Sequence, residues 1–213
     1  VLHAEQGIAC IGLPGTIDND IGGTDFTIGF DTAMNTAMQA IDRLRDTAAS
    51  HDRIFFVEVM GRHSGYLSMI AGIAGGAEEI LVPESPTDVK DLAALLRRGR
   101  ANGKLSMIVV VAEGDDAGNA LEIMRKLAEI SEFKDARATV IGHLQRGGSP
   151  TAFDRVLASR MGVRAVQALM AGETNCMVAI QGTRLALLPF SVAIDQRSLF
   201  DPELVQVARV LAV

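Results

Sequence analysis

Two acidic residues two positions apart, Asp18 and Asp20, stand in a glycine-flanked segment between Pro14 and Gly23. A carboxylate within hydrogen-bond reach of a hydroxyl can take its proton while that oxygen attacks a phosphoryl group. A second carboxylate can organise a metal ion, and glycines let the backbone approach a phosphate closely. A solvated turn is the simpler interpretation of this segment alone. A calcium loop is excluded, because Gly22 and Gly29 stand at its fifth and twelfth positions, where side-chain oxygen ligands are needed.

Arginines and glycines recur at the ends of apolar runs. Arg53 stands just before the run that starts at Ile54, and Arg62 follows that run directly after Gly61. An arginine beside a glycine where a strand ends suits the binding of a phosphate or an oxyanion. An arginine on a solvated rim is the competing interpretation of each residue taken alone.

Further candidates accompany the later apolar runs. Glu113 follows one of them, and its carboxylate could hold sugar hydroxyls. Arg137 precedes another run, which leads to His143 and Arg146 beside a pair of glycines. A cationic pair facing two glycines is a reasonable phosphate clamp. A histidine in an apolar strand is more often a core residue, so His143 has an ordinary alternative role.

Short β-rich runs alternate with longer helical patterns, which argues for an α/β fold with mostly parallel strands. In such folds ligands bind beyond the carboxyl ends of the strands, where most of the candidate clusters fall. The expected strands are Ile8–Leu13, Ile54–Met60, Glu79–Val82, Ser106–Ala112, Ala138–His143 and Met177–Ile180. The expected helices are Phe30–Leu44, Thr87–Asn102, Ala120–Ile130, Phe153–Ala171 and Pro202–Leu211, with Thr87 and Asp201 as N-caps.

Composition limits the class of protein. The 213 residues are 48% hydrophobic and carry a net charge of −6, which argues against a nucleic-acid partner. The longest uncharged apolar stretch, 63–77, is shorter than the roughly 20 residues that span a bilayer, so no membrane association is expected. Cys10 and Cys176 lie in apolar runs and are interpreted as reduced core residues, which makes the cytoplasm the expected location. The missing initiator Met suggests a fragment.

The segments around these candidates resemble the bacterial ATP-dependent 6-phosphofructokinases. The matching motifs are Pro14–Asp20, Val57–Arg62, Val82–Glu84 and Gly142–Pro150, and Asp154-Arg155 and Ala158–Arg160 extend the match. The resemblance covers essentially the whole chain and implies two Rossmann-like three-layer α/β/α domains with mostly parallel sheets. The nucleotide domain would be truncated, because the family's N-terminal third is missing. Residues 1–29 and 146–195 would be its remainder, and 30–145 with 196–213 the substrate domain.

The resemblance implies an enzyme of glycolysis that transfers the γ-phosphoryl of ATP to the 1-hydroxyl of fructose 6-phosphate. Asp18 would be the general base, Thr16 would hydrogen-bond near the transferring group, and Arg62 would stabilise its charge. Asp20 would help to organise Mg²⁺. The implied substrate-binding residues are Thr16, Asp18, Met60, Gly61, Arg62, Glu113, His143 and Arg146, with Arg53 and Arg137 reaching into the neighbouring subunit of a homotetramer.

Two further points concern the donor and the regulation. Pyrophosphate-using relatives look to have Lys where this chain has Gly15, so glycine favours ATP. A pyrophosphate-dependent enzyme and a non-catalytic sugar-phosphate-binding subunit are the alternatives. The fragment alone is expected to bind ATP poorly and to be inactive. A site for ADP or phosphoenolpyruvate is partly matched by Arg45, Gly76, Glu78 and Lys104, but Asn102 and Ser106 replace expected basic residues.

Overall fold

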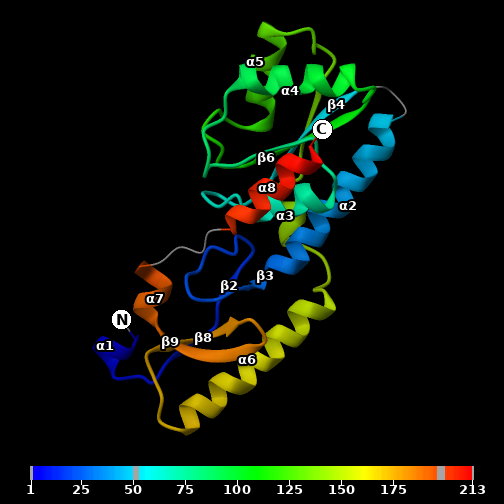
Figure 1. Cartoon of the computed structure of the whole chain (residues 1–213). Coiled ribbons are helices and arrows are strands. Elements are labelled where there is room, and N and C mark those ends of the chain that lie inside the picture. The colour runs from blue at the N-terminus through cyan, green and yellow to red at the C-terminus, as the bar shows by residue number, and fades with distance from the viewer. Residues whose placement is uncertain (1, 50–52, 196–199, 213) are drawn as a thin grey trace. The chain divides into compact units, whose positions relative to one another are not determined.

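The computed structural model describes residues 2–49, 53–195 and 200–212 (Figure 1). The chain divides into two compact units. The first comprises Val1–Thr32 with Ser149–Leu199, and the second comprises Ala33–Gly148 with Phe200–Val213. The sequence suggested boundaries after residues 29, 145 and 195.

The second unit is built on a four-stranded parallel sheet with the strand order β5-β6-β4-β7. Every residue of the central strand β6 is buried, because helices cover both faces of the sheet. Figure 1 shows α4 and α5 on one face and α3 and α8 on the other. The strands are β4 (Ile54–Val59), β5 (Glu79–Leu81), β6 (Met107–Ala112) and β7 (Arg137–Val140).

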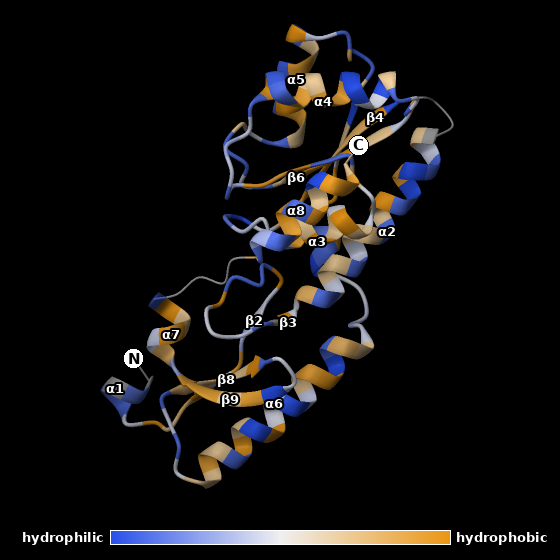
Figure 2. Cartoon of the chain, in the orientation of Figure 1, coloured by the Kyte–Doolittle hydropathy of each residue, from blue (hydrophilic) through white to orange (hydrophobic). Residues whose placement is uncertain are grey.

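The helices of this unit surround an aliphatic core. Leu96, Ile123 and Leu127 pack with Phe56 and Val109 from the sheet, and all five side chains are fully buried. Figure 2 shows the hydrophobic residues concentrated along β6. The helical elements are α2 (Phe30–Ala49), which begins in the first unit, α3 (Tyr66–Ala74), α4 (Val89–Ala101), α5 (Ala120–Ile130), the 3₁₀ helix η1 (Gly142–Arg146) and α8 (Pro202–Leu211).

The first unit holds a smaller sheet of order β1-β8-β9, in which β1 and β8 are parallel and β9 is antiparallel. A separate parallel pair, β2 with β3, closes the segment that carries the acidic residues. The elements are α1 (Leu2–Gln6), β1 (Ile11–Gly12), β2 (Gly15–Thr16), β3 (Ile28–Gly29), α6 (Ala152–Met170), β8 (Cys176–Gln181), β9 (Arg184–Pro189) and α7 (Phe190–Asp195).

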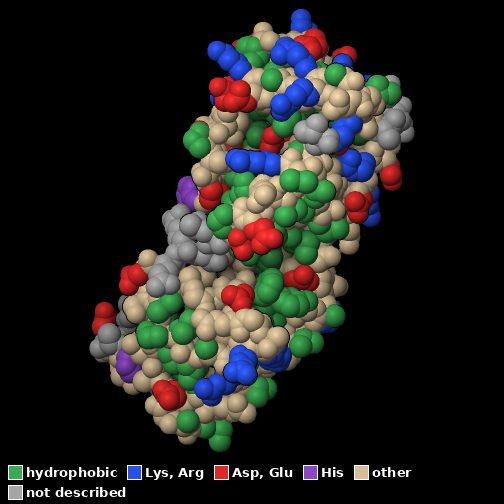
Figure 3. Space-filling view, in the orientation of Figure 1, with side chains coloured by type: hydrophobic (Ala, Val, Ile, Leu, Met, Phe, Trp, Pro, Cys, Tyr) green, Lys and Arg blue, Asp and Glu red, His purple; other side chains and the backbone are tan. Residues whose placement is uncertain are grey.

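Helix α6 has two apolar sides. Leu157 and Met161 are buried against β8, whereas Val163 is 60% exposed and Met170 is 84% exposed. A comparable surface lies over α3 and α8, where Figure 3 shows hydrophobic side chains and where Val210 is 73% exposed. None of the helices described is both long and apolar enough to cross a membrane.

The helix ends show one capping prediction confirmed and one wrong. Asp201 caps α8, since its carboxylate accepts the amide hydrogen of Glu203. The N-cap of α4 is Asp88, not Thr87, because Thr87 uses its hydroxyl to bond the Asp115 carboxylate instead. The expected strand 138–143 is also too long: β7 stops at Val140, and the next turn is 3₁₀-helical.

The two cysteines are free and differ in burial. Cys176 is buried, and this burial raises the pKa of its thiol above the ordinary value. Cys10 is only half-buried, and its thiol donates to the carbonyl of Ile8 at 3.3 Å. The interpretation of Cys10 as a core residue is therefore wrong, since the expected strand 8–13 shrinks to Ile11–Gly12.

Candidate functional site

The acidic segment of the first unit is folded around the side chain of Asn19, which is 1% exposed. Its Oδ1 accepts the amide hydrogen of Thr27 at 2.8 Å, and its Nδ2 donates to the carbonyl of Asp25 at 3.0 Å. The Thr27 hydroxyl in turn lies 2.7 Å from the carbonyl oxygen of Thr16. Asn19 has a φ of 49°, a left-handed conformation that Asn tolerates better than most residues. One buried amide therefore fixes the segment that carries both carboxylates.

The predicted catalytic residues of this segment flank that anchor. Asp18 is buried, and its backbone amide donates to the Thr16 hydroxyl at 3.1 Å, so these two residues lie together. Asp20 and Thr16 are half-buried. The segment is thus an ordered loop rather than a solvated turn, which was its simplest interpretation from sequence.

Three loops of the second unit follow the carboxyl ends of three adjacent strands. Met60, Gly61 and Arg62 follow β4, Glu113 follows β6, and the η1 turn with His143 and Arg146 follows β7 shortly after its last residue. Parallel neighbours bring their carboxyl ends to one edge of a sheet. The structure therefore brings together six substrate-binding residues that the family resemblance implied.

Side chains tie these loops to one another. Oε2 of Glu113 lies 3.3 Å from the amide nitrogen of Gly61 and 3.1 Å from that of Arg62. Oε1 of Gln145 accepts the amide hydrogen of Met60 at 3.0 Å. The carboxylate of Glu113 and the carboxamide of Gln145 thus hold the 60–62 segment from two sides.

The turn that presents Arg62 has an unusual backbone. Arg62 has a φ of 51°, and Gly61 has a φ of 152°, which favours glycine. The turn is closed by the amide of Ser64, which donates to the carbonyl of Gly61 at 2.8 Å. A Cβ on Gly114 would lie 1.8 Å from the Arg62 carbonyl oxygen, so only glycine fits there. The Arg62 side chain itself is exposed, as a cation that meets a ligand must be.

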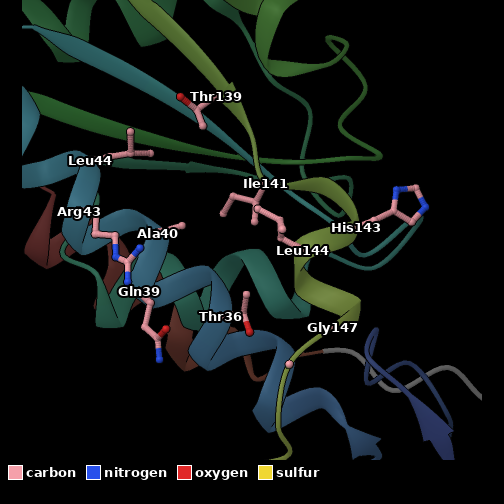
Figure 4. Close-up of a pocket in the computed structure, with 11 residues that line it drawn as sticks. Thr36, Gln39, Ala40, Arg43, Leu44, Thr139, Ile141, His143, Leu144 and Gly147 are labelled. Atoms are coloured by element: carbon pink, nitrogen blue, oxygen red, sulfur yellow. The ribbon is translucent and has the colours of Figure 1, made fainter.

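His143 and Arg146 are exposed on η1, and His143 is therefore not the core histidine of the alternative interpretation. A cleft of about 640 Å³ lies between α2 and the segment 139–148. Figure 4 shows Thr36, Gln39 and Arg43 on its α2 side, with the His143 ring pointing away from that helix. His143 is the single predicted substrate residue among those that line this cleft.

Arg53 and Arg137 lie at the opposite edge of the same sheet. Arg53 precedes β4 and Arg137 opens β7, and the register pairs Arg137 with Phe55. The guanidinium of Arg137 donates to the carbonyls of Asp135 and Ala136 at 3.1 and 3.0 Å. Six strand residues at about 3.3 Å each place this edge roughly 20 Å from the carboxyl edge. Within one copy the two arginines are therefore remote from Arg62.

The residues matched to an effector site also come together. The Arg45 guanidinium donates to the carbonyls of Gly75 and Gly76 at 2.7 and 2.5 Å. Glu78, which is 6% exposed, lies 3.9 Å from Arg45 and 3.5 Å from Lys104. Its other oxygen accepts the amide hydrogen of Ile108. Both cations thus already face a buried carboxylate.

Sequence reasoning missed Asn19 and Gln145, although each stands inside a motif that had been singled out. Their side chains carry no charge, and their partners are backbone amides and carbonyls that only the fold brings near. Full burial of an amide side chain in a loop is the signal that marks them.

The fold is that of an α/β protein with a parallel sheet, and the predicted residues follow the carboxyl edge of that sheet, where ligands bind in such folds. Residues 1–169 match the family model described as phosphofructokinase, so the chain belongs to the phosphofructokinase family.

Among relatives, the chain is 52% identical over 209 residues to an ATP-dependent 6-phosphofructokinase of Bacillus cytotoxicus and 52% identical over 211 residues to ATP-dependent 6-phosphofructokinase 1 of Thermus thermophilus. These alignments cover 98% and 99% of the chain. The chain spans 65% of the length of each of these curated relatives.

Solved structures agree. The chain is similar to phosphofructokinase from Saccharomyces cerevisiae, with a TM-score of 0.82 and 36% identity over 88% of the chain and 26% of that protein. It also matches a pyrophosphate-dependent phosphofructokinase from Nitrosospira multiformis, with a TM-score of 0.85 over the whole chain and 62% of that protein. The identity to the second is 22%, so this likeness concerns the fold alone. The expected α/β fold with parallel sheets is confirmed.

Proposed function

We propose that this chain is part of an ATP-dependent 6-phosphofructokinase, which transfers the γ-phosphoryl of ATP to the 1-hydroxyl of fructose 6-phosphate. The observation that carries the proposal is the gathering of Gly61, Arg62, Glu113, His143 and Arg146 at the carboxyl edge of three adjacent strands. Two arginines and a histidine suit a sugar phosphate, and a carboxylate suits sugar hydroxyls. The names of the 52% identical relatives agree with this substrate and donor.

The residues have the following roles in the proposal. Asp18 takes the proton of the attacking hydroxyl, and the Thr16 hydroxyl, which lies against the Asp18 amide, bonds near the transferring group. The exposed Arg62 stabilises the charge on the phosphoryl group in the transition state. Met60 and Gly61 supply the backbone of the pocket wall beside Glu113.

The chemistry of the acidic loop fits Mg²⁺. Mg²⁺ commonly takes one or two carboxylates and completes its shell with waters and substrate phosphates. Asp20, half-buried and two residues from Asp18, is such a carboxylate. Waters and substrate phosphates would supply the remaining ligands of the ion. When bound, it would neutralise charge on the transferring phosphates.

Gly15 bears on the phosphoryl donor. It is exposed, and a Cβ at this position would meet nothing within 4 Å, so glycine is not demanded by packing. We infer that the small residue leaves room for a nucleotide. This favours ATP over pyrophosphate, the donor named for the Nitrosospira protein. A non-catalytic sugar-phosphate-binding subunit is the less favoured reading, because Asp18 is buried in an ordered loop that mere binding does not need.

The proposal extends to assembly. Arg53 and Arg137 share the amino edge of the sheet, remote from the other substrate residues, so they would serve the 6-phosphate in a neighbouring copy of a homotetramer. A cytoplasmic location rests on the interpretation of the two free cysteines as reduced. A response to ADP or phosphoenolpyruvate at Arg45, Gly76, Glu78 and Lys104 rests on the family resemblance. Fragment inactivity without the remaining third of the family's length is part of the same proposal.

The proposal is tested with Asp18→Ser in the full-length protein that contains this sequence. We expect kcat to fall by about 10²–10⁴-fold, the usual contribution of a general base, with little change in fructose 6-phosphate binding. Rates with ATP and with pyrophosphate are compared in the unsubstituted protein. A near-normal kcat in Asp18→Ser rules out the general-base role, and a faster rate with pyrophosphate reverses the donor assignment.

A further inference from the structure

Gln145 differs from its neighbours in the η1 turn. Its side chain is 1% exposed, whereas Leu144 is 74% exposed and Arg146 also faces solvent. Among the described residues it is one of the largest fully buried side chains, and the only amide in that group. Burying an amide costs free energy unless hydrogen bonds replace those to water. The contacts of this side chain therefore show what it does.

The carboxamide oxygen of Gln145 extends the strand ladder beyond its end. The last backbone bond between the ends of β4 and β7 runs from the amide of Ile141 to the carbonyl of Glu58 at 3.1 Å. Beyond this bond, the amide of Met60 has no backbone partner in the segment that follows β7. Oε1 of Gln145 accepts this amide hydrogen at 3.0 Å. The side chain thus supplies one more rung, between the two segments that carry the proposed substrate residues.

The carboxamide nitrogen of Gln145 is buried and makes no hydrogen bond to any residue that the structure describes. Buried donors of this kind normally have a partner, protein or ordered water. Within the described part of the chain, the oxygen therefore makes the only hydrogen bond of this side chain. No second hydrogen bond to a described residue accounts for its burial, so we take the bond to Met60 as its role in the fold.

We propose that Gln145 is a positioning residue, which fixes the Met60–Arg62 turn relative to the η1 turn with His143 and Arg146. A fructose 6-phosphate that contacts both loops at once requires a fixed distance and orientation between them. This consequence for substrate rests on the proposed function, whereas the Gln145–Met60 bond does not. Glu113 holds the same turn from the β6 side, so Gln145 and Glu113 together hold it from both neighbouring strands.

The test compares Gln145→Met, which removes the acceptor, with Gln145→Glu, which keeps an oxygen there. Ser131→Ala is the control: it removes two hydrogen bonds at the carboxyl end of α5, from the serine hydroxyl to the Leu127 carbonyl and from the Phe133 amide to the serine oxygen. Hydrogen exchange of the Met60 amide is followed by NMR in the chain, and fructose 6-phosphate binding is titrated in the full-length protein. Gln145→Asn replaces Gln145→Met should the latter fail to fold, since its shorter side chain also loses the bond.

We expect Met60 to exchange about tenfold faster in Gln145→Met and to stay protected in Gln145→Glu. The dissociation constant for fructose 6-phosphate should rise about 5- to 10-fold in Gln145→Met and stay unchanged in Ser131→Ala. Unchanged Met60 exchange in Gln145→Met, or equal binding losses in that variant and the control, overturns the proposal. An unsubstituted protein that fails to bind the sugar phosphate refutes the proposed function instead, while Met60 exchange still decides the role of Gln145.

Discussion

The carboxylate of Glu113 accepts the amide hydrogen of Arg62, with Oε2 3.1 Å from the backbone nitrogen. The same oxygen lies 3.3 Å from the amide nitrogen of Gly61. A residue that sequence suggested only as a partner for sugar hydroxyls thus also supports the backbone of the proposed phosphoryl-binding arginine. Glu113 can serve both purposes, because a carboxylate has two oxygens.

Replacing Glu113 should weaken substrate binding through the Arg62 turn. Hydrogen bonds to a charged group contribute about 1.5–3 kcal/mol, so Glu113→Ala should raise the KM for fructose 6-phosphate at least tenfold in the full-length protein. Glu113→Gln keeps an oxygen acceptor and should lose less. Steady-state kinetics of the two variants provide the comparison. If glutamine is as damaging as alanine, the charge matters rather than the support of the turn.

Gly114 should tolerate no side chain. An added Cβ would lie 1.8 Å from the carbonyl oxygen of Arg62, which is backbone and has little freedom to move. Gly114→Ala should destabilise the fold by about 1–3 kcal/mol, measured by urea unfolding. Gly162 is the control, since it lies within α6 with nothing within 4 Å of a Cβ. Gly162→Ala should stabilise by up to about 1 kcal/mol, and equal losses at both positions would contradict the steric argument.

Asn19 should be replaceable by Gly with less damage than by Ala. Both changes remove the carboxamide that bonds Thr27 and Asp25, but only glycine accepts the φ of 49° without strain. The expected losses of unfolding free energy are about 1–3 kcal/mol for Asn19→Gly, and about 1 kcal/mol more for Asn19→Ala. Thermal unfolding of the two variants measures the difference. Alanine equal to glycine would mean that the left-handed conformation costs nothing here.

Glu79 gives the fold a pH dependence. Its burial raises the pKa of this carboxyl above the ordinary value of 4.5, outweighing the amide of Ile80 and the charge of Arg209, which lower it. The native protein therefore holds this proton at pH values where the unfolded chain has released it. Stability then falls as pH rises from about 4.5 through the raised pKa, and the loss persists above it.

Glu79→Gln removes that titration. Its stability relative to the unsubstituted protein should increase between about pH 4 and pH 7. Urea unfolding at several pH values measures this, with the exposed Glu129→Gln as the control. A relative stability of Glu79→Gln that declines with rising pH would show that the ionised carboxylate is stabilised in the fold.

The sequence pattern predicts elements whose environment is uniform along their length. The run 107–112 is a continuous apolar segment and is buried throughout, the run 54–59 departs from this only at the half-buried Glu58, and helices α5 and α8 have the bounds that their periodicity indicates. Helix α3 escaped prediction because Gly65, Gly72 and Gly75 surround and interrupt it, and such glycines normally indicate a loop. The two-residue strands β2 and β3 have no periodicity at all and depend on the bonds of Asn19 and Thr27.

The candidate site also has residues that the sequence pattern predicts and contacts that it does not. The rule that ligands bind at the carboxyl ends of parallel strands made Arg62 and Glu113 candidates from sequence, because charged residues beside glycine stand there, and the family resemblance supplied their predicted roles. The hydrogen bond between the Glu113 carboxylate and the Arg62 amide could not be predicted from sequence, since the two residues are 51 positions apart and only the fold brings them together. Gln145 and Asn19 carry no charge and contact backbone groups, which no pattern of residue types reveals.

The separation of Arg53 and Arg137 from the carboxyl edge has a genetic consequence under the proposed shared site. Each pocket would combine Arg62 from one subunit with Arg53 from another. Two variants with different substitutions can therefore form intact pockets in a mixed oligomer. A mixture of Arg53→Ala and Arg62→Ala proteins should regain activity when their subunits exchange, because some pockets then receive neither defect. Each variant alone has every pocket defective, so complementation between two inactive alleles reports directly on which edges of the sheet meet.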